Sequence, residues 1–74
     1  MHEFDVAADL GDAGCGDLAI ELMRAIKPLR AGQVLQVRAL DPGARADIPA
    51  WCKMRGHALV YSEREFYYIQ KGEK

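Results

Sequence analysis

The spacing of apolar residues changes repeatedly along this 74-residue chain, and that change limits the fold more than any other feature. Residues 3–10 begin with an alternation of apolar and polar side chains, which is typical of a half-buried strand. After a loop that contains three glycines, the apolar residues recur at helical spacing. These residues are Leu18, Leu22, Ala25, Ile26 and Leu29. We therefore predict a strand followed by an amphipathic helix that ends at Gly32.

A second strand and a second helix are predicted from residues 33–56. Residues 33–40 alternate apolar and polar side chains and contain β-branched residues, which favours a strand. A turn at Asp41-Pro42-Gly43 follows. Asp47 is a suitable N-cap for the next helix, because its carboxylate can accept the free backbone N–H groups there. Pro49 would then lie in the first turn, and Gly56 would follow the last residue.

Two more strands complete the chain, so the predicted order is β-α-β-α-β-β. Residues 58–62 and 65–70 have strand-like patterns and are separated by Glu63-Arg64, a turn without the usual glycine. This order predicts an α+β two-layer sandwich in one domain, residues 1–74. The four-stranded sheet would be mixed, with both helices on one face. The order of the strands within the sheet does not follow from the sequence.

Composition excludes several classes of function. Ten basic and eleven acidic residues give a net charge of −1, which offers no basic field for direct nucleic-acid binding. No apolar run approaches the length of a membrane span, and we expect a cytoplasmic protein without a membrane partner. The cysteines and histidines lack the paired spacing of a zinc site, so neither a metal nor another cofactor is predicted.

Cys15 is the residue that most suggests chemistry. It lies in Gly14-Cys15-Gly16-Asp17-Leu18, where a strand gives way to a helix. Free amides and the positive end of the helix dipole favour an anion there, so we predict that Gly14, Gly16, Asp17 and Leu18 stabilise a Cys15 thiolate. The carboxylates of Asp12 and Asp17 oppose that ionisation. The sequence leaves open whether Cys15 is reactive or only part of a loop.

The other polar and aromatic candidates are better explained by structure than by chemistry. Cys52 follows Trp51 on the apolar face of a helix and is predicted to be a buried structural thiol. His57 is interpreted as a surface or capping residue. Arg45, Lys53 and Arg55 are interpreted as a solvated face. Core packing accounts for most of the aromatic side chains among Trp51, Phe66, Tyr67 and Tyr68. Tyr67 and Tyr68 must point to opposite faces of the sheet.

Several segments of the chain resemble the TusA/SirA family of small sulfur-carrier proteins. The similar segments are Asp41-Pro42, Asp47-Ile48-Pro49-Ala50-Trp51-Cys52, Gly56-His57-Ala58-Leu59 and Tyr68-Ile69-Gln70-Lys71-Gly72. The family has a cysteine at the start of its first helix, in the pattern Cys-Pro-x-Pro. This chain has Cys15-Gly16-Asp17-Leu18 at that position, which indicates a divergent branch.

The resemblance implies both a fold and a function. The implied fold is the β-α-β-α-β-β sandwich found in the C-terminal domain of bacterial translation initiation factor three. The implied function is a sulfurtransferase-type carrier, in which Cys15 accepts sulfane sulfur as a persulfide from a cysteine desulfurase or a rhodanese-like donor. A downstream acceptor protein would take the sulfur for tRNA thiolation, cofactor synthesis or sulfur metabolism.

Two alternatives compete with the carrier hypothesis. The first is a non-catalytic interaction or regulatory module that keeps the fold. The second, by analogy with the initiation-factor domain, is RNA binding, which the net charge disfavours.

Overall fold

The elements of the folded chain follow the predicted order. The computed structural model describes residues 3–73, except for the side chain of Cys15. The elements are β1 (Val6–Gly11), α1 (Cys15–Ile26), β2 (Val34–Ala39), α2 (Ala44–Arg55), β3 (Ala58–Glu63) and β4 (Phe66–Gln70). The β-α-β-α-β-β prediction is confirmed.

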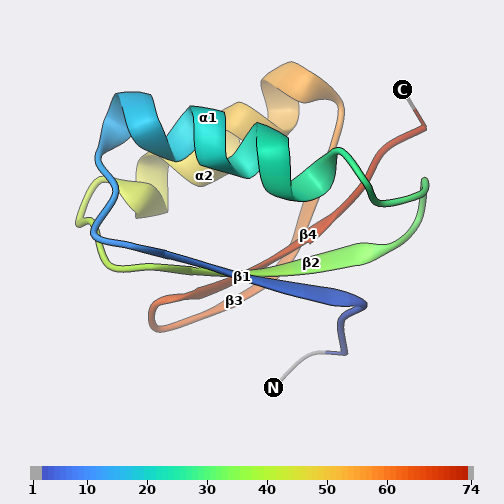
Figure 1. Ribbon diagram of the computed structural model, residues 1–74, viewed down its shortest axis with the longest axis horizontal. Coiled ribbons are helices and arrows are strands. Elements are labelled where there is room, and N and C mark those ends of the chain that lie inside the picture. The colour runs from blue at the N-terminus through green and yellow to red at the C-terminus, as the bar shows by residue number, and fades with distance from the viewer. Residues whose placement is uncertain (1–2, 74) are drawn as a thin grey trace.

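The four strands form one mixed sheet in the order β1-β2-β4-β3. β1 pairs with β2 in parallel, whereas β4 pairs antiparallel with both β2 and β3. Both helices cover the same face of this sheet (Figure 1). The predicted two-layer α+β sandwich is therefore confirmed.

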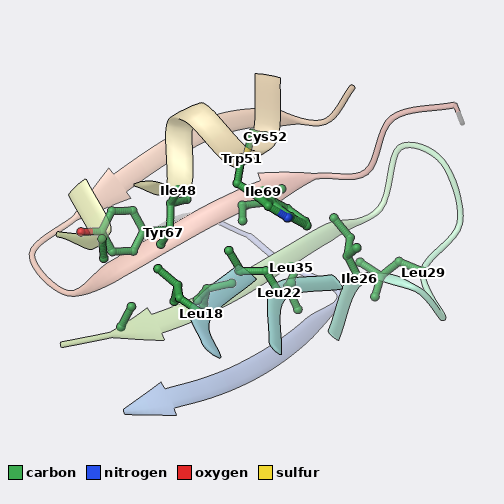
Figure 2. Packing of buried hydrophobic residues seen from close by; sticks show 13 residues of the cluster. Leu18, Leu22, Ile26, Leu29, Leu35, Ile48, Trp51, Cys52, Tyr67 and Ile69 are labelled. Atoms are coloured by element: carbon green, nitrogen blue, oxygen red, sulfur yellow. The ribbon is translucent and has the colours of Figure 1, made fainter. Parts of the chain in front are cut away.

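The core lies between the helices and the sheet (Figure 2). Leu18, Leu22 and Ile26 are buried because they recur every four residues on α1 and so share one face. Their partners come from three other elements: Leu35, Val37 and Ala39 on β2, Ala44, Ile48, Trp51 and Cys52 on α2, and Tyr67 and Ile69 on β4. Burial of a leucine side chain contributes about 1.5–3 kcal/mol to stability. This cluster therefore fixes the start of α1 against the sheet.

α1 ends at Ile26, earlier than the apolar spacing predicts. Pro28 has no N–H group to continue the helical hydrogen bonds, and the chain leaves the helix after Lys27. Leu29 is still buried in the core, although it lies beyond the helix. Gly32 has a φ of +91°, which suits glycine, and lies in the turn before β2.

α2 begins at Ala44 with Gly43 as its N-cap, so the prediction that Asp47 caps this helix is wrong. The Asp41 carboxylate accepts the Gly43 N–H at 3.0 Å, and the Ala44 N–H donates to the Asp41 carbonyl at 3.0 Å. This turn starts the helix three residues before Asp47. Pro49 consequently lies inside α2 and not in its first turn.

The turn between β3 and β4 also differs from the prediction by one residue. Glu63 pairs with Phe66, so the two turn residues are Arg64 and Glu65. Arg64 has a φ of +56°, a left-handed conformation that costs a non-glycine residue about 1–2 kcal/mol.

Candidate functional site

The loop between β1 and α1 is held by hydrogen bonds between residues that are close in sequence. Gly11 has a φ of +55°, which glycine adopts without steric cost, and its N–H donates to the Asp9 carboxylate at 2.9 Å. The Ala13 N–H donates to the Leu10 carbonyl at 3.1 Å. These contacts turn the chain out of the sheet, and α1 then begins at Cys15.

No side chain that the structure describes caps the start of α1. Gly14 precedes the helix with φ −83° and ψ −176°, and it makes no side-chain cap hydrogen bond. The Leu18 N–H donates to the Gly14 carbonyl at 2.6 Å, which closes the first turn. The N–H groups of the three intervening residues have no carbonyl partner within the helix, and they form the positive end of its dipole. An anion at this helix start would meet these groups.

The structure places the backbone of all five predicted site residues around the start of α1. Gly14 is the N-cap, Cys15 is the first helical residue, and Gly16 and Asp17 are exposed in the first turn. Leu18 has a different role, since its side chain is only 1% exposed and its N–H is already donated to Gly14. The Cys15 side chain lies outside the described part of the chain, so its reactivity stays a prediction.

The backbone around Cys15 leaves room for an approaching molecule. A Cβ atom added at Gly14 or Gly16 would meet no other atom within 4 Å. Asp17 in the first turn is favourable for the helix, but its carboxylate opposes a second negative charge nearby.

Cys52 occupies the buried position that the sequence predicts. Its side chain is 2% exposed, and burial raises the pKa of its thiol to about 11. Because the thiolate is the nucleophilic form, Cys52 is unreactive near neutral pH. The prediction that Cys52 is structural is confirmed.

His57 contacts the segment that follows β4 and is half-buried, and its N–H donates to the Cys52 carbonyl at 2.8 Å, so the capping part of the surface-or-capping interpretation is confirmed. Its Nδ1 accepts the Gly72 N–H at 2.9 Å, and its ring centre lies 5.3 Å from that of Trp51. Burial, together with the charges of Lys71 and Arg55, lowers the pKa of His57. His57 lies between the end of α2 and the start of β3, whereas Cys15 starts α1 at the end of the molecule where α2 also begins (Figure 1). The imidazole therefore has no access to the start of α1.

No metal-binding cluster of three or more His, Cys, Asp or Glu side chains occurs in the part of the chain that the structure describes. Within residues 3–73, neither helix has the length and apolar character needed to cross a membrane.

Two adjoining clefts lie at the end of the sheet where β1 and β2 finish. The Leu40 N–H donates to the Gly11 carbonyl at 2.7 Å, and the Ala39 N–H donates to the Glu65 carbonyl at 2.9 Å. These bonds bring the β1–α1 loop and the β3–β4 turn to the same end of β2. The larger cleft, about 530 Å³, is lined by Ala39, Leu40, Asp41, Pro42, Arg45, Arg64, Glu65 and Tyr67.

The smaller cleft, about 260 Å³, is lined by Arg45, Pro49, Leu59, Ser62, Arg64 and Tyr67, and we call it the Arg45–Arg64 pocket. Sequence reasoning missed it, because its residues come from α2, β3, the β3–β4 turn and β4. The predictions for two of its residues hold without revealing the pocket, since Arg45 is exposed and Tyr67 belongs to the buried core. The one signal for the pocket was a tight turn that carries Arg64 where glycine is usual.

Comparison with known proteins gives consistent matches over most of the chain. The family model for the sulfurtransferase TusA matches residues 9–71. The sulfur carrier protein TusA of Pseudomonas aeruginosa (strain LESB58) is 34% identical over 74 residues, which cover 95% of this chain and 94% of that protein.

Two proteins of Bacillus subtilis (strain 168) are also similar. YrkI is 35% identical over 72 residues, 92% of this chain and 96% of YrkI. YrkF is 30% identical over an aligned length of 76. The alignment covers 97% of this chain but only 41% of YrkF. The chain therefore matches the full length of some relatives and less than half of a longer one.

Proposed function

This chain belongs to the TusA sulfurtransferase family, and from that premise we propose that it carries sulfane sulfur as a persulfide on Cys15. The donor is a cysteine desulfurase or a rhodanese-like protein, and the acceptor is a second protein. The observation that carries this proposal is the position of Cys15 at the start of α1. Its N-cap is Gly14, which has no side chain to accept a hydrogen bond from the first N–H groups of the helix.

Sulfur transfer at this position needs no external oxidant or reductant. The Cys15 thiolate attacks the terminal sulfur of the donor persulfide, and a bond forms between that sulfur and Cys15 Sγ. The bond between the terminal sulfur and the donor cysteine breaks, and the donor leaves as a thiolate that takes up a proton. In the second step an acceptor thiolate attacks the same terminal sulfur, and Cys15 leaves as the thiolate.

The backbone at the start of α1 favours both steps. Cys15 is a thiolate when it attacks and again when it leaves, so stabilisation of that charge lowers both barriers. We assign this role to the N–H groups of Gly16 and Asp17, since Leu18 has already donated its N–H to Gly14. We place this chemistry in the cytoplasm, where thiols are kept reduced.

Sulfur loading by a desulfurase tests the proposal. The protein is incubated with a cysteine desulfurase and free cysteine, and added sulfur is located by peptide mass spectrometry. We expect one added sulfur on the peptide that contains Cys15, none in Cys15→Ser, and normal loading in Cys52→Ala. Absence of sulfur from the wild-type Cys15 peptide, with an active desulfurase, would overturn the proposal and favour the non-catalytic module.

A further inference from the structure

The Arg45–Arg64 pocket is lined by hydrogen-bond donors and contains no carboxylate. Its polar side chains are two guanidinium groups and the hydroxyls of Ser62 and Tyr67. Pro49 and Leu59 form its apolar wall. Guanidinium groups pair with carboxylates through parallel hydrogen bonds, so this lining suits an oxyanion.

The side-chain donors of this pocket form no ion pair or hydrogen bond with other groups of residues 3–73. Neither Arg45 nor Arg64 has an ion pair or hydrogen bond with any residue that the structure describes. Tyr67 is only 4% exposed, yet its hydroxyl has no hydrogen-bond partner within residues 3–73. In Figure 2 this hydroxyl points away from Ile48 and Trp51. The hydroxyl oxygen itself is reached by solvent, because no side-chain polar atom in the described part of the chain is both buried and without a partner, and a ligand in the pocket would replace that solvent as its acceptor.

Carboxylates near the pocket are occupied by other groups. Asp41 accepts the Gly43 N–H, and Glu65 lies 3.8 Å from the Arg38 guanidinium. Glu63 accepts a hydrogen bond from the Tyr61 hydroxyl at 3.1 Å. The charge of Arg64 helps to lower the pKa of Glu63, but neither pocket arginine forms an ion pair in the described part of the chain, and both guanidinium groups can donate to a negative group from outside the chain.

Arg64 has a strained backbone conformation, which is a second indication that its side chain is functional. A glycine would adopt its φ of +56° without cost, whereas an arginine is disfavoured there. Backbone strain of this kind is concentrated at functional sites.

The pocket shares Arg45, Arg64 and Tyr67 with the larger cleft, which reaches the end of β2 beside the β1–α1 loop. A continuous groove of this size is longer than a free inorganic ion requires and fits a peptide segment with apolar and acidic side chains. Its lining includes the end of β2 and the start of α2, and these lie at the end of the molecule where α1 starts (Figure 1).

We propose that the Arg45–Arg64 pocket binds the carboxylate of an acidic side chain in a protein that exchanges sulfur with Cys15. This inference rests on the proposed function and names the chemistry of the partner. The carboxylate pairs with Arg45 and Arg64 and accepts the Tyr67 hydroxyl, which positions the partner against the start of α1.

NMR titration of the ¹⁵N-labelled full chain tests this proposal. The probes are the blocked tripeptides Gly-Glu-Gly and Gly-Gln-Gly, with sodium sulfate as a third, separate titrant. We expect saturable shifts of the Arg45, Ser62 and Arg64 signals with the glutamate peptide only. Equal shifts with the glutamine peptide, saturation by sulfate alone, or no saturable shift would each overturn the proposal.

Three variants separate binding from folding. Arg64→Gly relieves the positive φ and Tyr67→Phe removes a hydroxyl without a partner, so neither variant loses stability. Together with Arg45→Gln, each is expected to weaken glutamate-peptide binding about ten-fold or more. Lys53→Gln, a loss of charge at an exposed position of α2 outside the pocket, is the matched control and leaves binding unchanged.

The two proposals can fail separately. If a desulfurase loads Cys15 but the glutamate peptide does not bind, the pocket proposal is wrong and the carrier function stands. If the peptide binds but Cys15 never gains sulfur, the carrier function is wrong, and with it the identity of the docking partner.

Discussion

The Gly72 N–H donates to His57 Nδ1 at 2.9 Å, so a side chain at the end of α2 holds the segment that follows β4. The same segment pairs with the start of β2, where the Gly32 N–H donates to the Lys71 carbonyl and the Lys71 N–H donates to the Gln33 carbonyl, both at 2.8 Å. The C-terminal segment thereby connects both layers of the fold.

The surroundings of His57 make stability depend on pH, because burial and the charges of Lys71 and Arg55 disfavour its protonated form. The pKa of His57 is lowered in the folded protein, so the unfolded chain binds protons more readily near pH 6.5. Stability therefore rises with pH across the interval between the folded and unfolded pKa values, and falls when the pH is lowered through it. Protonation of Nδ1 also removes the acceptor for Gly72. We expect the urea midpoint to be lower at pH 5 than at pH 7.5.

His57→Gln is the control for that measurement. Its urea midpoint should change less than that of the wild type over the same pH interval, because the titrating group is gone. An equal change in both proteins would show that His57 is not the cause.

The two cysteines should differ sharply in their reaction with iodoacetamide. With a pKa of about 11, on the order of one Cys52 thiol in ten thousand is ionised at pH 7, and the group is also buried. We expect rapid alkylation of Cys15 below pH 8 and modification of Cys52 only in urea. Peptide mass spectrometry measures both rates, and comparable slow rates in the native protein would contradict the proposed thiolate at Cys15.

Lys71 should contribute to stability through the residues that follow α1. Its Nζ donates to the Leu29 carbonyl at 2.5 Å and to the Lys27 carbonyl at 3.0 Å. Lys71→Met keeps the apolar stem but removes both bonds, and we expect a loss of about 1.5–3 kcal/mol in the free energy of unfolding. Removal of the Lys71 charge should also raise the pKa of His57, which NMR titration would measure.

Lys53→Met provides the comparison for Lys71→Met. Lys53 is exposed on α2 and makes no side-chain hydrogen bond in the described part of the structure, so its replacement should change stability little. A similar loss in the two variants would refute the role given to the Lys71 ammonium group.

Two glycine-to-alanine variants should change stability in opposite directions. A Cβ at Gly72 would overlap the Gly56 carbonyl oxygen, so Gly72→Ala should cost about 1–3 kcal/mol. A Cβ at Gly16 meets nothing within 4 Å, and Gly16→Ala in α1 should stabilise the protein by about 0.5–1 kcal/mol. Urea unfolding measures both changes, and a destabilised Gly16→Ala would indicate a packing role for Gly16 that its surroundings do not suggest.

Local patterns predicted the order of elements and most of the core. The four-residue spacing of Leu18, Leu22 and Ile26 indicates which face of α1 is buried. The buried position of Cys52 was likewise predicted from its place on the apolar face of α2. The start of α2 was misplaced because Asp47 is a good capping residue in isolation, whereas the Asp41 turn begins the helix earlier.

Features that depend on distant residues could not be predicted. The insertion of β4 between β2 and β3 is set by packing of the whole sheet, not by a local pattern. The Arg45–Arg64 pocket likewise combines α2 with the β3–β4 hairpin, and its unpartnered Tyr67 hydroxyl is visible only in the folded chain. The glycine loop, by contrast, correctly indicated the helix start at Cys15.

The antiparallel pairing of β4 with β2 has a practical consequence. β4 finishes beside the start of β2, so the chain leaves the sheet opposite the end where α1 begins (Figure 1). A linker attached to the segment that follows β4 would therefore anchor the protein to a bead or sensor chip with the start of α1 facing the solution.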